Sequence, residues 1–460
     1  MNESLWQRIL DFNLEHREYD YGFALRLAKE NYWTQHFTAK AILEYRKFMY
    51  LAATSDFMVS PSPVIDDVWH QHLIHTQSYN EFCKLLGKRI EHIPSTRSET
   101  DRNRFEQAKQ KTHELYQSIF GEAPSDIWQQ YDMFTGLGLQ KAPIKIRAFL
   151  LWGILAFVSC IPVSFFTIGY LYPFIPNPHF LVGYLSLIVA SLGFLWVYNN
   201  RLAKKWITSL PPDSFIFQMT PSEMIGFEEG FVAPIIHNTV NELTRRGAIR
   251  VHQNLKLEKI AEVSKTNTED ELIVLNAMEA GYGYLYPTLY KKLVPNTLFH
   301  NCTNCTRALK KYLLKSVLFF SVFRINFIVL SSLLMIGVTR LLTGLIREKP
   351  VVNLSTVLIC LVIVTFLALN HSAQLFSKEV VIKHYKKRLI PALKQAQQKE
   401  WSFFKLGKAA LVGYFATIIT TAAPPYGFKK NDDNSDGCGS SCGSSCGSSC
   451  GGGCGGCGGD

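Results

Sequence analysis

Closely spaced histidines make the N-terminal third of the chain a candidate for metal binding. His70, His72 and His75 lie within six residues of one another in a stretch that is otherwise typical of a helix. Imidazole nitrogens are common zinc ligands, and a zinc site takes three or four protein ligands. On a regular helix His70 and His72 point about 200° apart, so they cannot share an ion there. One interpretation is a metal or ligand site of His70, His72 and His92, completed from outside this stretch.

A second interpretation is that the same stretch belongs to a protein core that contains some polar atoms. At helical spacing, one arc of the stretch carries Trp69, His72, Tyr79 and Cys83. Large side chains that share one helical face are more often buried against a neighbour than used as ligands. We favour this interpretation, in which Asp66, Trp69, Tyr79 and Cys83 are structural motif positions.

The end of the chain carries a second group of potential metal ligands. Six of the 11 cysteines lie there among glycine and serine: Cys438, Cys442, Cys446, Cys450, Cys454 and Cys457. With nothing apolar to bury, residues 431–460 are expected to be disordered without a ligand. Reduced thiols can bind Zn(II) or Cu(I), but the tail could equally be covalently modified or inert. By contrast, Cys302 and Cys305 form a lone C-x-x-C, which we expect to be two reduced cytosolic thiols.

Long apolar stretches predict an integral membrane protein. Residues 148–172 and 180–198 contain no charged side chain, and roughly 20 helical residues cross about 30 Å of hydrocarbon. Lys and Arg flank this pair but are absent from its turn, which predicts a hairpin over 148–198 with both ends cytoplasmic. A second hairpin is predicted over 325–369. Its first arm contains Arg340, which we expect to anchor at the membrane interface.

The remaining segments are more polar and complete the predicted organisation: a soluble helical domain at 1–140, an insert at 201–315, and a basic helix with a short apolar segment at 376–430. Within the insert, residues 221–260 predict two helices and a two-stranded ribbon, a winged-helix-like outline. The second helix carries Arg245 and Arg246 only at its end, so we do not expect nucleic acid as a partner. The apolar segment 409–424 is short for a span and predicts an interfacial or packed helix, with a fifth span as the alternative.

The distribution of charge supports this topology. The formal net charge is +11 at pH 7, and the cations gather at the ends of the apolar stretches rather than on one soluble face. Such a pattern is typical of topology signals in a multi-pass protein. The predicted fold class is therefore mainly α, a polytopic helical membrane protein with two transmembrane hairpins.

Two resemblances to protein families follow from ordered motifs. The first rests on D-x-x-W-H-x-H from Asp66, Y-x-x-x-C from Tyr79, and then Gly87, His92, the FGE of 120–122 and Trp128. Over about residues 30–135 the chain thereby resembles glycine-rich domain-containing proteins, which implies a module but no reaction.

The second resemblance covers about residues 200–460. Its motifs are MTPSEMIGFEEG, VNELTRRGAIRV, GVTRLLTGLIREKPVVNL and the Cys/Gly-rich tail. Together they resemble an uncharacterised family of bacterial membrane proteins, although the Cys-Gly-Ser-Ser repeats of the tail depart from the longer glycine runs of that family.

These observations predict a membrane-tethered binding or scaffold protein of the bacterial inner membrane, with both termini cytoplasmic and the lipid bilayer and a further protein as partners. The alternatives are a metal-dependent enzyme or metal-binding protein that uses the N-terminal histidines, with Zn or Cu(I) as the ion, and a membrane-anchored regulator. The sequence names no catalytic residue, no reaction and no oligomeric state.

Overall fold

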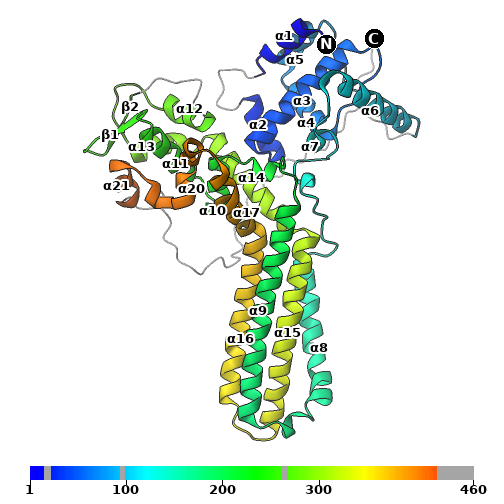
Figure 1. Cartoon of the computed structure of the whole chain (residues 1–460), viewed down its shortest axis with the longest axis vertical. Coiled ribbons are helices and arrows are strands. Elements are labelled where there is room, and N and C mark those ends of the chain that lie inside the picture. Colours follow the sequence, from blue (N-terminus) through cyan, green and yellow to red (C-terminus); the bar gives the residue numbers. More distant parts are fainter. Residues whose placement is uncertain (15–21, 94–98, 261–267, 422–460) are drawn as a thin grey trace, which may run out of the picture.

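The computed structural model describes residues 1–14, 22–93, 99–260 and 268–421. The chain is mainly helical, as predicted, with one small antiparallel sheet. Figure 1 shows a column of four long helices that carries two smaller bodies at one end. One body is N-terminal, and the other combines the segment between the two hairpins with the C-terminal helices.

The N-terminal body is built around one central helix. Its helices are α1 (Glu3–Asp11), α2 (Phe23–Asn31), α3 (Gln35–Thr54), α4 (Pro63–Ile74), α5 (Thr76–Leu86), α6 (Glu99–Phe120) and α7 (Ser125–Trp128). Helix α3 contacts α1, α2, α4 and α6. Its residues Phe37, Ala41, Tyr45 and Phe48 are almost fully buried and recur every three to four positions, which is the stripe expected of a core helix.

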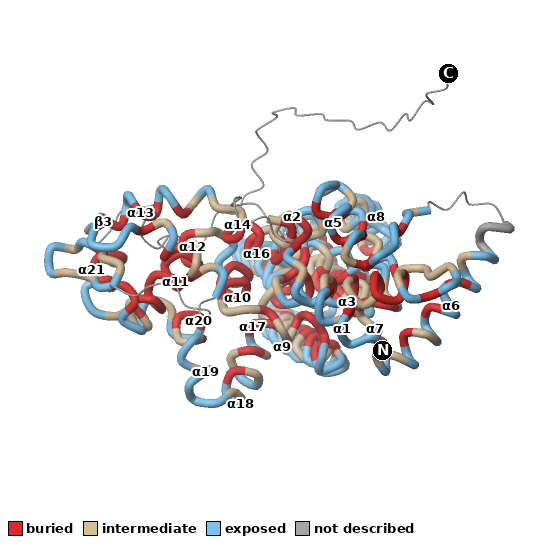
Figure 2. The backbone as a smooth tube through the Cα atoms, turned by 90° about the horizontal axis from the view of Figure 1, so that it is seen from above, coloured by how far each residue is buried: buried red, intermediate tan, exposed pale blue. Residues whose placement is uncertain are grey.

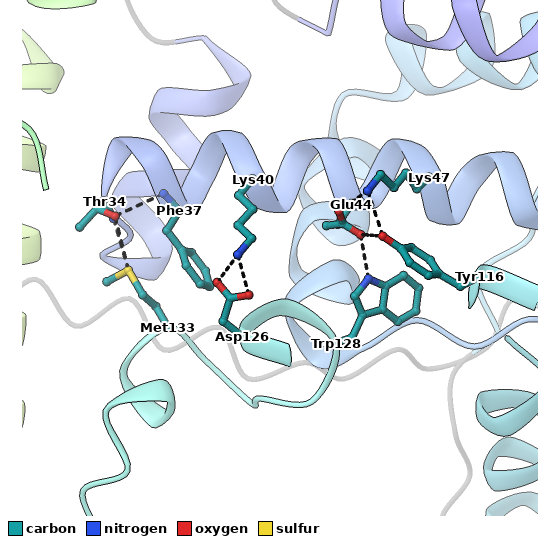
Figure 3. Close-up of polar contacts among 9 residues, drawn as sticks. All are labelled: Thr34, Phe37, Lys40, Glu44, Lys47, Tyr116, Asp126, Trp128 and Met133. Carbon is teal, nitrogen blue, oxygen red and sulfur yellow. Dashed lines mark hydrogen bonds and ion pairs between the residues drawn. The ribbon is translucent and has the colours of Figure 1, made fainter. Parts of the chain in front are cut away.

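Buried polar contacts join α6 and α7 of this body to α3. Glu44 accepts hydrogen bonds from the Tyr116 hydroxyl of α6 and the Trp128 indole N–H of α7, both at 2.8 Å (Figure 3). Lys47 Nζ lies 2.7 Å from Oε1, the second carboxylate oxygen of Glu44. A carboxylate can be buried at low cost only when its charge and lone pairs are satisfied, as they are here.

Among the described residues, four helices are long and apolar enough to cross a membrane. They are α8 (Ile146–Ile168), α9 (Asn177–Ser209), α15 (Val317–Ile346) and α16 (Val352–Gln374). Many of their large apolar side chains face outward; Trp152 and Phe166, for example, are 69% and 79% exposed. An apolar surface of this extent is not expected in water, and it suggests a membrane protein.

The four helices form the two predicted hairpins. Both interhelical turns lie at the end of the column that is remote from the two bodies (Figure 1), so the chain enters and leaves each hairpin at the same end. Arg340 of α15 donates hydrogen bonds to the carbonyl oxygens of Tyr172 and Ile175 and to Asn177 Oδ1. It therefore ties the second hairpin to the turn of the first.

The segment between the hairpins contains the only sheet among the described residues. Its elements are α10 (Pro221–Glu229), α11 (Ala233–Arg245), β1 (Ile249–Val251), β2 (Lys256–Lys259), α12 (Glu269–Asn276), β3 (Tyr284–Leu285), α13 (Tyr286–Leu293) and α14 (Thr297–Leu314). Helix α10 begins with a capping box between Thr220 and Glu223 and ends at Gly230, which has the left-handed φ of 84° that favours glycine. The predicted helices and ribbon correspond to α10, α11, β1 and β2, and the structure adds β3 beside β2.

Beyond α16 the chain continues as a long helix and then folds onto the insert. The continuation contains π-helical turns at Leu375–Glu379 and Tyr385–Leu389, with α17 (Val380–His384) and α18 (Ile390–Ala392). After α19 (Gln395–Glu400), the helices α20 (Ser402–Leu406) and α21 (Gly413–Thr421) meet at a bend of 72°.

The short apolar segment predicted at 409–424 lies in this bent pair. If the pair is counted as one span, the candidate spans number five. Helix α21, however, contacts α11 and β1, and its Phe415 is fully buried. A nine-residue helix is about 14 Å long, less than half of the hydrocarbon thickness, so its packing fits the predicted packed helix better. Residues 422–424 and the tail lie outside the described residues.

The two bodies contact each other beside the column. Seen from above, α2 of the N-terminal body and α14 of the other body lie side by side (Figure 2), and these two helices are in contact. Asn301 of α14 donates a hydrogen bond to the Leu25 carbonyl oxygen at 2.9 Å, and the buried Glu223 accepts one from the Gln35 backbone N–H at 2.7 Å. Burial raises the pKa of Glu223 to about 7.

Candidate metal centre

Asp66, His70 and His92 form a cluster whose possible ligand atoms all lie within 4.8 Å of one another. His92 Nε2 is 3.0 Å from Asp66 Oδ1, and His70 Nδ1 is 3.9 Å from Asp66 Oδ2. The centroids of the two imidazole rings are 4.6 Å apart. The structure therefore brings His70 and His92 together, and it adds Asp66, which we had expected to be only a structural position.

Helix α4 supplies two of these three side chains. It begins where Ser62 Oγ accepts a hydrogen bond from the Ile65 backbone N–H, with Pro63 at the first helical position. Both are favourable helix starts, because serine satisfies a free N–H and proline has none. Asp66 and His70 are four residues apart on this helix, so their side chains lie on the same face.

The third side chain reaches the cluster because the chain turns back after α5. Gly87 ends that helix with a φ of 74°, a left-handed conformation that glycine adopts without strain. The Tyr79 hydroxyl then donates to the Ile90 carbonyl oxygen at 2.5 Å and accepts a hydrogen bond from Trp69 Nε1 at 3.1 Å. The ring of Trp69 also packs edge-on against His92, with 4.7 Å between centroids. Two residues of the predicted motif thus position His92.

His72 lies apart from the cluster, contrary to the predicted set of His70, His72 and His92. Its side chain is fully buried, with Nδ1 2.8 Å from the Tyr45 hydroxyl and Nε2 3.1 Å from Ser78 Oγ. Burial lowers the pKa of His72 to about 3, so the ring is neutral. Both of its nitrogens are engaged inside the core, and this is why it is not available to the ion that His70 and His92 could share. Cys83 is buried in the same core.

The predicted single helix through the histidine stretch is wrong. Helix α4 ends at Ile74, and α5 begins at Thr76. His75 separates them with φ −85° and ψ 63°, which is not helical. The break changes the direction of the chain, so faces drawn across the whole stretch as one helix do not persist into α5.

A cavity of about 810 Å³ opens beside the cluster. Asp66, His70 and His92 line it together with the aromatic rings of Trp69 and Phe57. This volume lies in the range of small-molecule sites in proteins.

The charged side chains of the cavity have both signs. Arg104 and Lys109 are exposed on its wall and form no ion pair within the part of the chain that the structure describes. Lys88 instead donates to the carbonyl oxygens of Ala52 and Ser55, at 3.1 and 3.2 Å. Arg89 pairs with Glu91 at 3.0 Å. Two cations thus remain available to an anionic group in the cavity.

A second carboxylate next to the cluster also favours a bound cation. Asp67 follows Asp66 directly, and its pKa is raised to about 6, first by burial and then by the charge of Asp66. A metal ion beside Asp66 would relieve this repulsion between carboxylates.

The donor set fits a divalent transition-metal ion. Two imidazoles and one carboxylate are a set that binds zinc and non-haem iron, with coordination positions left for water or another ligand. Two donors at about 2.1 Å from one zinc ion are at most about 4.2 Å apart. The two printed separations from Asp66, 3.0 Å to His92 Nε2 and 3.9 Å to His70 Nδ1, are within this limit. The side chain of His70 is 54% exposed, so it can adjust its position around an ion.

The cysteines of the tail and of the C-x-x-C pair form two separate groups. Cys438, Cys442, Cys446, Cys450, Cys454 and Cys457 lie outside the described residues. Cys302 and Cys305 are unpaired and buried in α14, and burial raises the pKa of each thiol well above its usual value. A neutral thiol is a poor metal ligand, so the expectation of two reduced thiols is consistent with their position.

Comparison with known proteins corrects the family resemblances. A model of the UCP032817-like family matches residues 13–116, which include Asp66, His70 and His92. The expected resemblance to glycine-rich domain-containing proteins is therefore wrong, and no family evidence supports the resemblance expected over 200–460. No curated protein and no solved structure matches the chain. The matched segment is less than a quarter of the 460 residues, so the chain is similar to the UCP032817-like family over most of its N-terminal body.

Proposed function

We propose that this protein is a membrane-anchored binding protein whose N-terminal body binds one divalent transition-metal ion through Asp66, His70 and His92. The observation that carries the proposal is the position of these three ligands, drawn from two segments, on the wall of a cavity of about 810 Å³. A bound ion would act as a Lewis acid at that wall. The free coordination positions would face a ligand in the cavity.

The membrane anchor is the column of α8, α9, α15 and α16, and we place it in the bacterial inner membrane with both termini cytoplasmic. Four helices of sufficient length and hydropathy support this placement. Further support comes from cations such as Lys145, Arg147, Arg201 and Lys204, which lie next to the apolar stretches on the side of the two bodies. The metal site would then face the cytoplasm.

A metal-dependent enzyme is the second candidate. Three protein ligands with an open position are the arrangement of catalytic zinc sites, whereas structural zinc sites are usually closed by four protein ligands. Trp69, Phe57, Arg104 and Lys109 around the cavity would select the ligand in either case. Both candidates use the same metal site. The enzyme would convert the ligand in the cavity to a product, whereas the binding protein would release it unchanged.

Metal titration of the full-length protein in detergent tests the shared site. All six tail cysteines are replaced by serine, so that the tail cannot compete for the ion. Zn(II) should then bind with a stoichiometry of one, and His70→Ala or His92→Ala should weaken binding by at least 100-fold, since each removes one of three ligands.

His113→Ala is the matched control, because His113 is an exposed histidine of the same body on α6. It should leave the affinity unchanged. Equal losses in the control and in the ligand variants, or no stoichiometric binding, would overturn the proposal. His72→Gln, in contrast, should reduce stability while leaving one metal site.

A further inference from the structure

A second cavity lies at the end of the column that faces the two bodies. Its volume is about 340 Å³, and it is formed between α9 and the helical continuation of α16. Its cationic lining residues are Lys204, Lys383, Lys387 and Arg388. Apolar side chains, among them Ala203, Ile207, Leu375 and Val380, line the same space.

Most of the positive charge at this cavity is not neutralised. Lys383 pairs with Glu379 at 2.6 Å. Lys204, Lys387 and Arg388 are exposed, and none of them forms an ion pair with any residue in the described ranges. Cations drawn together without counter-charges repel one another, and a bound anion would relieve this repulsion.

The lower end of the cavity lies at the depth of lipid headgroups. The uncharged stretch of α9 ends at Tyr198, and Asn199, Asn200 and Arg201 follow it. Lys204 is six residues beyond Tyr198, which corresponds to about 9 Å along the helix axis. The polar headgroup layer adds about 5–8 Å on each side of the hydrocarbon, so Asn200 at the lower end of the cavity lies within that layer and Lys204 lies at its outer edge.

Two π-helical turns shape the side of the cavity opposite α9. They lie at Leu375–Glu379 and Tyr385–Leu389, on either side of α17. Turns of this kind are rare and often mark functional sites, because they shift the phase of the side chains that follow. Leu375, Lys387 and Arg388 come from these turns and line the cavity.

We propose that this cavity binds the headgroup of one anionic phospholipid from the cytoplasmic leaflet. The phosphate would lie against Lys204, Lys387 and Arg388, and the glycerol with the upper acyl chains would lie against the apolar wall. A volume of about 340 Å³ accommodates one such headgroup but not a helix or a nucleic-acid strand. The proposal rests on the membrane placement given above and is independent of the metal site.

Native mass spectrometry of the full-length protein in detergent tests this site with two lipids, phosphatidylglycerol and phosphatidylcholine. The wild-type protein should retain one phosphatidylglycerol at least tenfold more tightly than phosphatidylcholine. Each of Lys204→Gln, Lys387→Gln and Arg388→Gln should weaken phosphatidylglycerol binding roughly fivefold, the effect expected for one cation near a phosphate.

Lys205→Gln and Lys399→Gln are the matched controls, because both lysines are exposed and neither lines the cavity. They should change the affinity less than twofold. Equal losses in the control and cavity variants would show general surface attraction and overturn the proposal, as would equal retention of the two lipids.

Inorganic phosphate and glycerol 3-phosphate distinguish a lipid from a soluble phosphate. Neither should displace the lipid at millimolar concentration; full displacement would overturn the lipid assignment and identify a site for free phosphate. Recovery of the protein in the soluble fraction of cells would instead contradict the membrane placement. Failure of the lipid site and failure of the membrane placement are therefore distinguishable.

Discussion

The N-terminal body and the helical column bury their side chains in opposite ways. In the N-terminal body, large aromatic residues such as Phe48 are fully buried, and Glu44 is enclosed by partners from α6 and α7. In the column, residues of the same kind face outward, and Phe166 is 79% exposed. The first region is stabilised by its own core, whereas the second needs an apolar solvent around it.

The same contrast determines where chemistry can occur. The N-terminal body places polar side chains from distant segments next to one another, and the Asp66, His70 and His92 cluster is one result. In the column, buried side chains from different helices meet in the layer of Asn199, Asn326 and Ser372, which joins α9, α15 and α16. We therefore expect ligand chemistry in the N-terminal body and at the polar ends of the column.

The largest predicted difference is in the loss of stability when one of two phenylalanines, Phe48 or Phe166, is replaced by alanine. Phe48→Ala should destabilise the N-terminal body by about 3–5 kcal/mol, because it leaves a cavity in a closed core. Phe166→Ala should change the stability of the column in lipid by less than about 0.5 kcal/mol, because lipid chains fill the vacated space. Hydrogen exchange of the full-length protein in nanodiscs measures both regions in one sample. Similar losses at the two positions would contradict the comparison.

A smaller effect is expected from the buried carboxylate of the N-terminal body. Glu44→Gln keeps the shape of the side chain, but its NH₂ group must replace either the oxygen that accepts from both Tyr116 and Trp128 or the oxygen that pairs with Lys47. The substitution should lower the free energy of unfolding by about 1–3 kcal/mol, the penalty for a buried polar group that loses its partner. The measurement is amide exchange in α3 and α6. Glu114→Gln on the exposed face of α6 is the control and should have no effect.

The contact between the two bodies should respond to pH through Glu223. Its pKa in the folded protein is about 7, above the ordinary value of 4.5. Between these values the folded protein binds more protons than the unfolded chain, so the free energy of unfolding should fall as the pH rises, by at most about 1.4 kcal/mol per pH unit.

Apparent melting temperatures between pH 5 and 8 measure this dependence. The difference between the wild-type protein and Glu223→Gln should change across that window and become constant above about pH 8. A pH-independent difference would show that Glu223 does not titrate there.

The smallest effect is expected in the polar layer of the column. Asn326→Leu removes the hydrogen bonds to Asn199 that cross from α15 to α9. Interhelical hydrogen bonds in membranes contribute on average about 0.6 kcal/mol, so the loss should be of that order. Steric-trapping measurements in bicelles can resolve it. A cost of several kcal/mol would mean that polar contacts hold the column together as they do the N-terminal body.

The sequence predicts the column better than the site. Apolar stretches of about 20 residues are a local signal, and they correspond to α8, α9, α15 and α16, although the stretch in α15 contains Arg340. Helical periodicity and alternation also predict the succession of two helices and a two-stranded ribbon, which are α10, α11, β1 and β2. In each case the decisive information lies within one short window.

The metal cluster depends on contacts that no short window contains. Asp66 and His92 are 26 residues apart, and they meet because the chain breaks at His75 and turns at Gly87. The spacing of the histidines along the sequence led to a predicted set that included His72, although Tyr45 and Ser78 hold its ring in the core. The spacing of Asp66 and His70, four residues apart on one helical face, was the signal that could have identified the carboxylate ligand.

X-ray absorption at the zinc edge tests the central claim most directly. The sample is the full-length protein with all six tail cysteines changed to serine and with one equivalent of Zn(II). The account predicts only nitrogen and oxygen ligands at about 2.0–2.1 Å, with the scattering of two imidazoles that decreases to one in His92→Ala. Sulfur ligands at about 2.3 Å, or an unchanged spectrum in His92→Ala, would contradict the assignment of the ion to Asp66, His70 and His92.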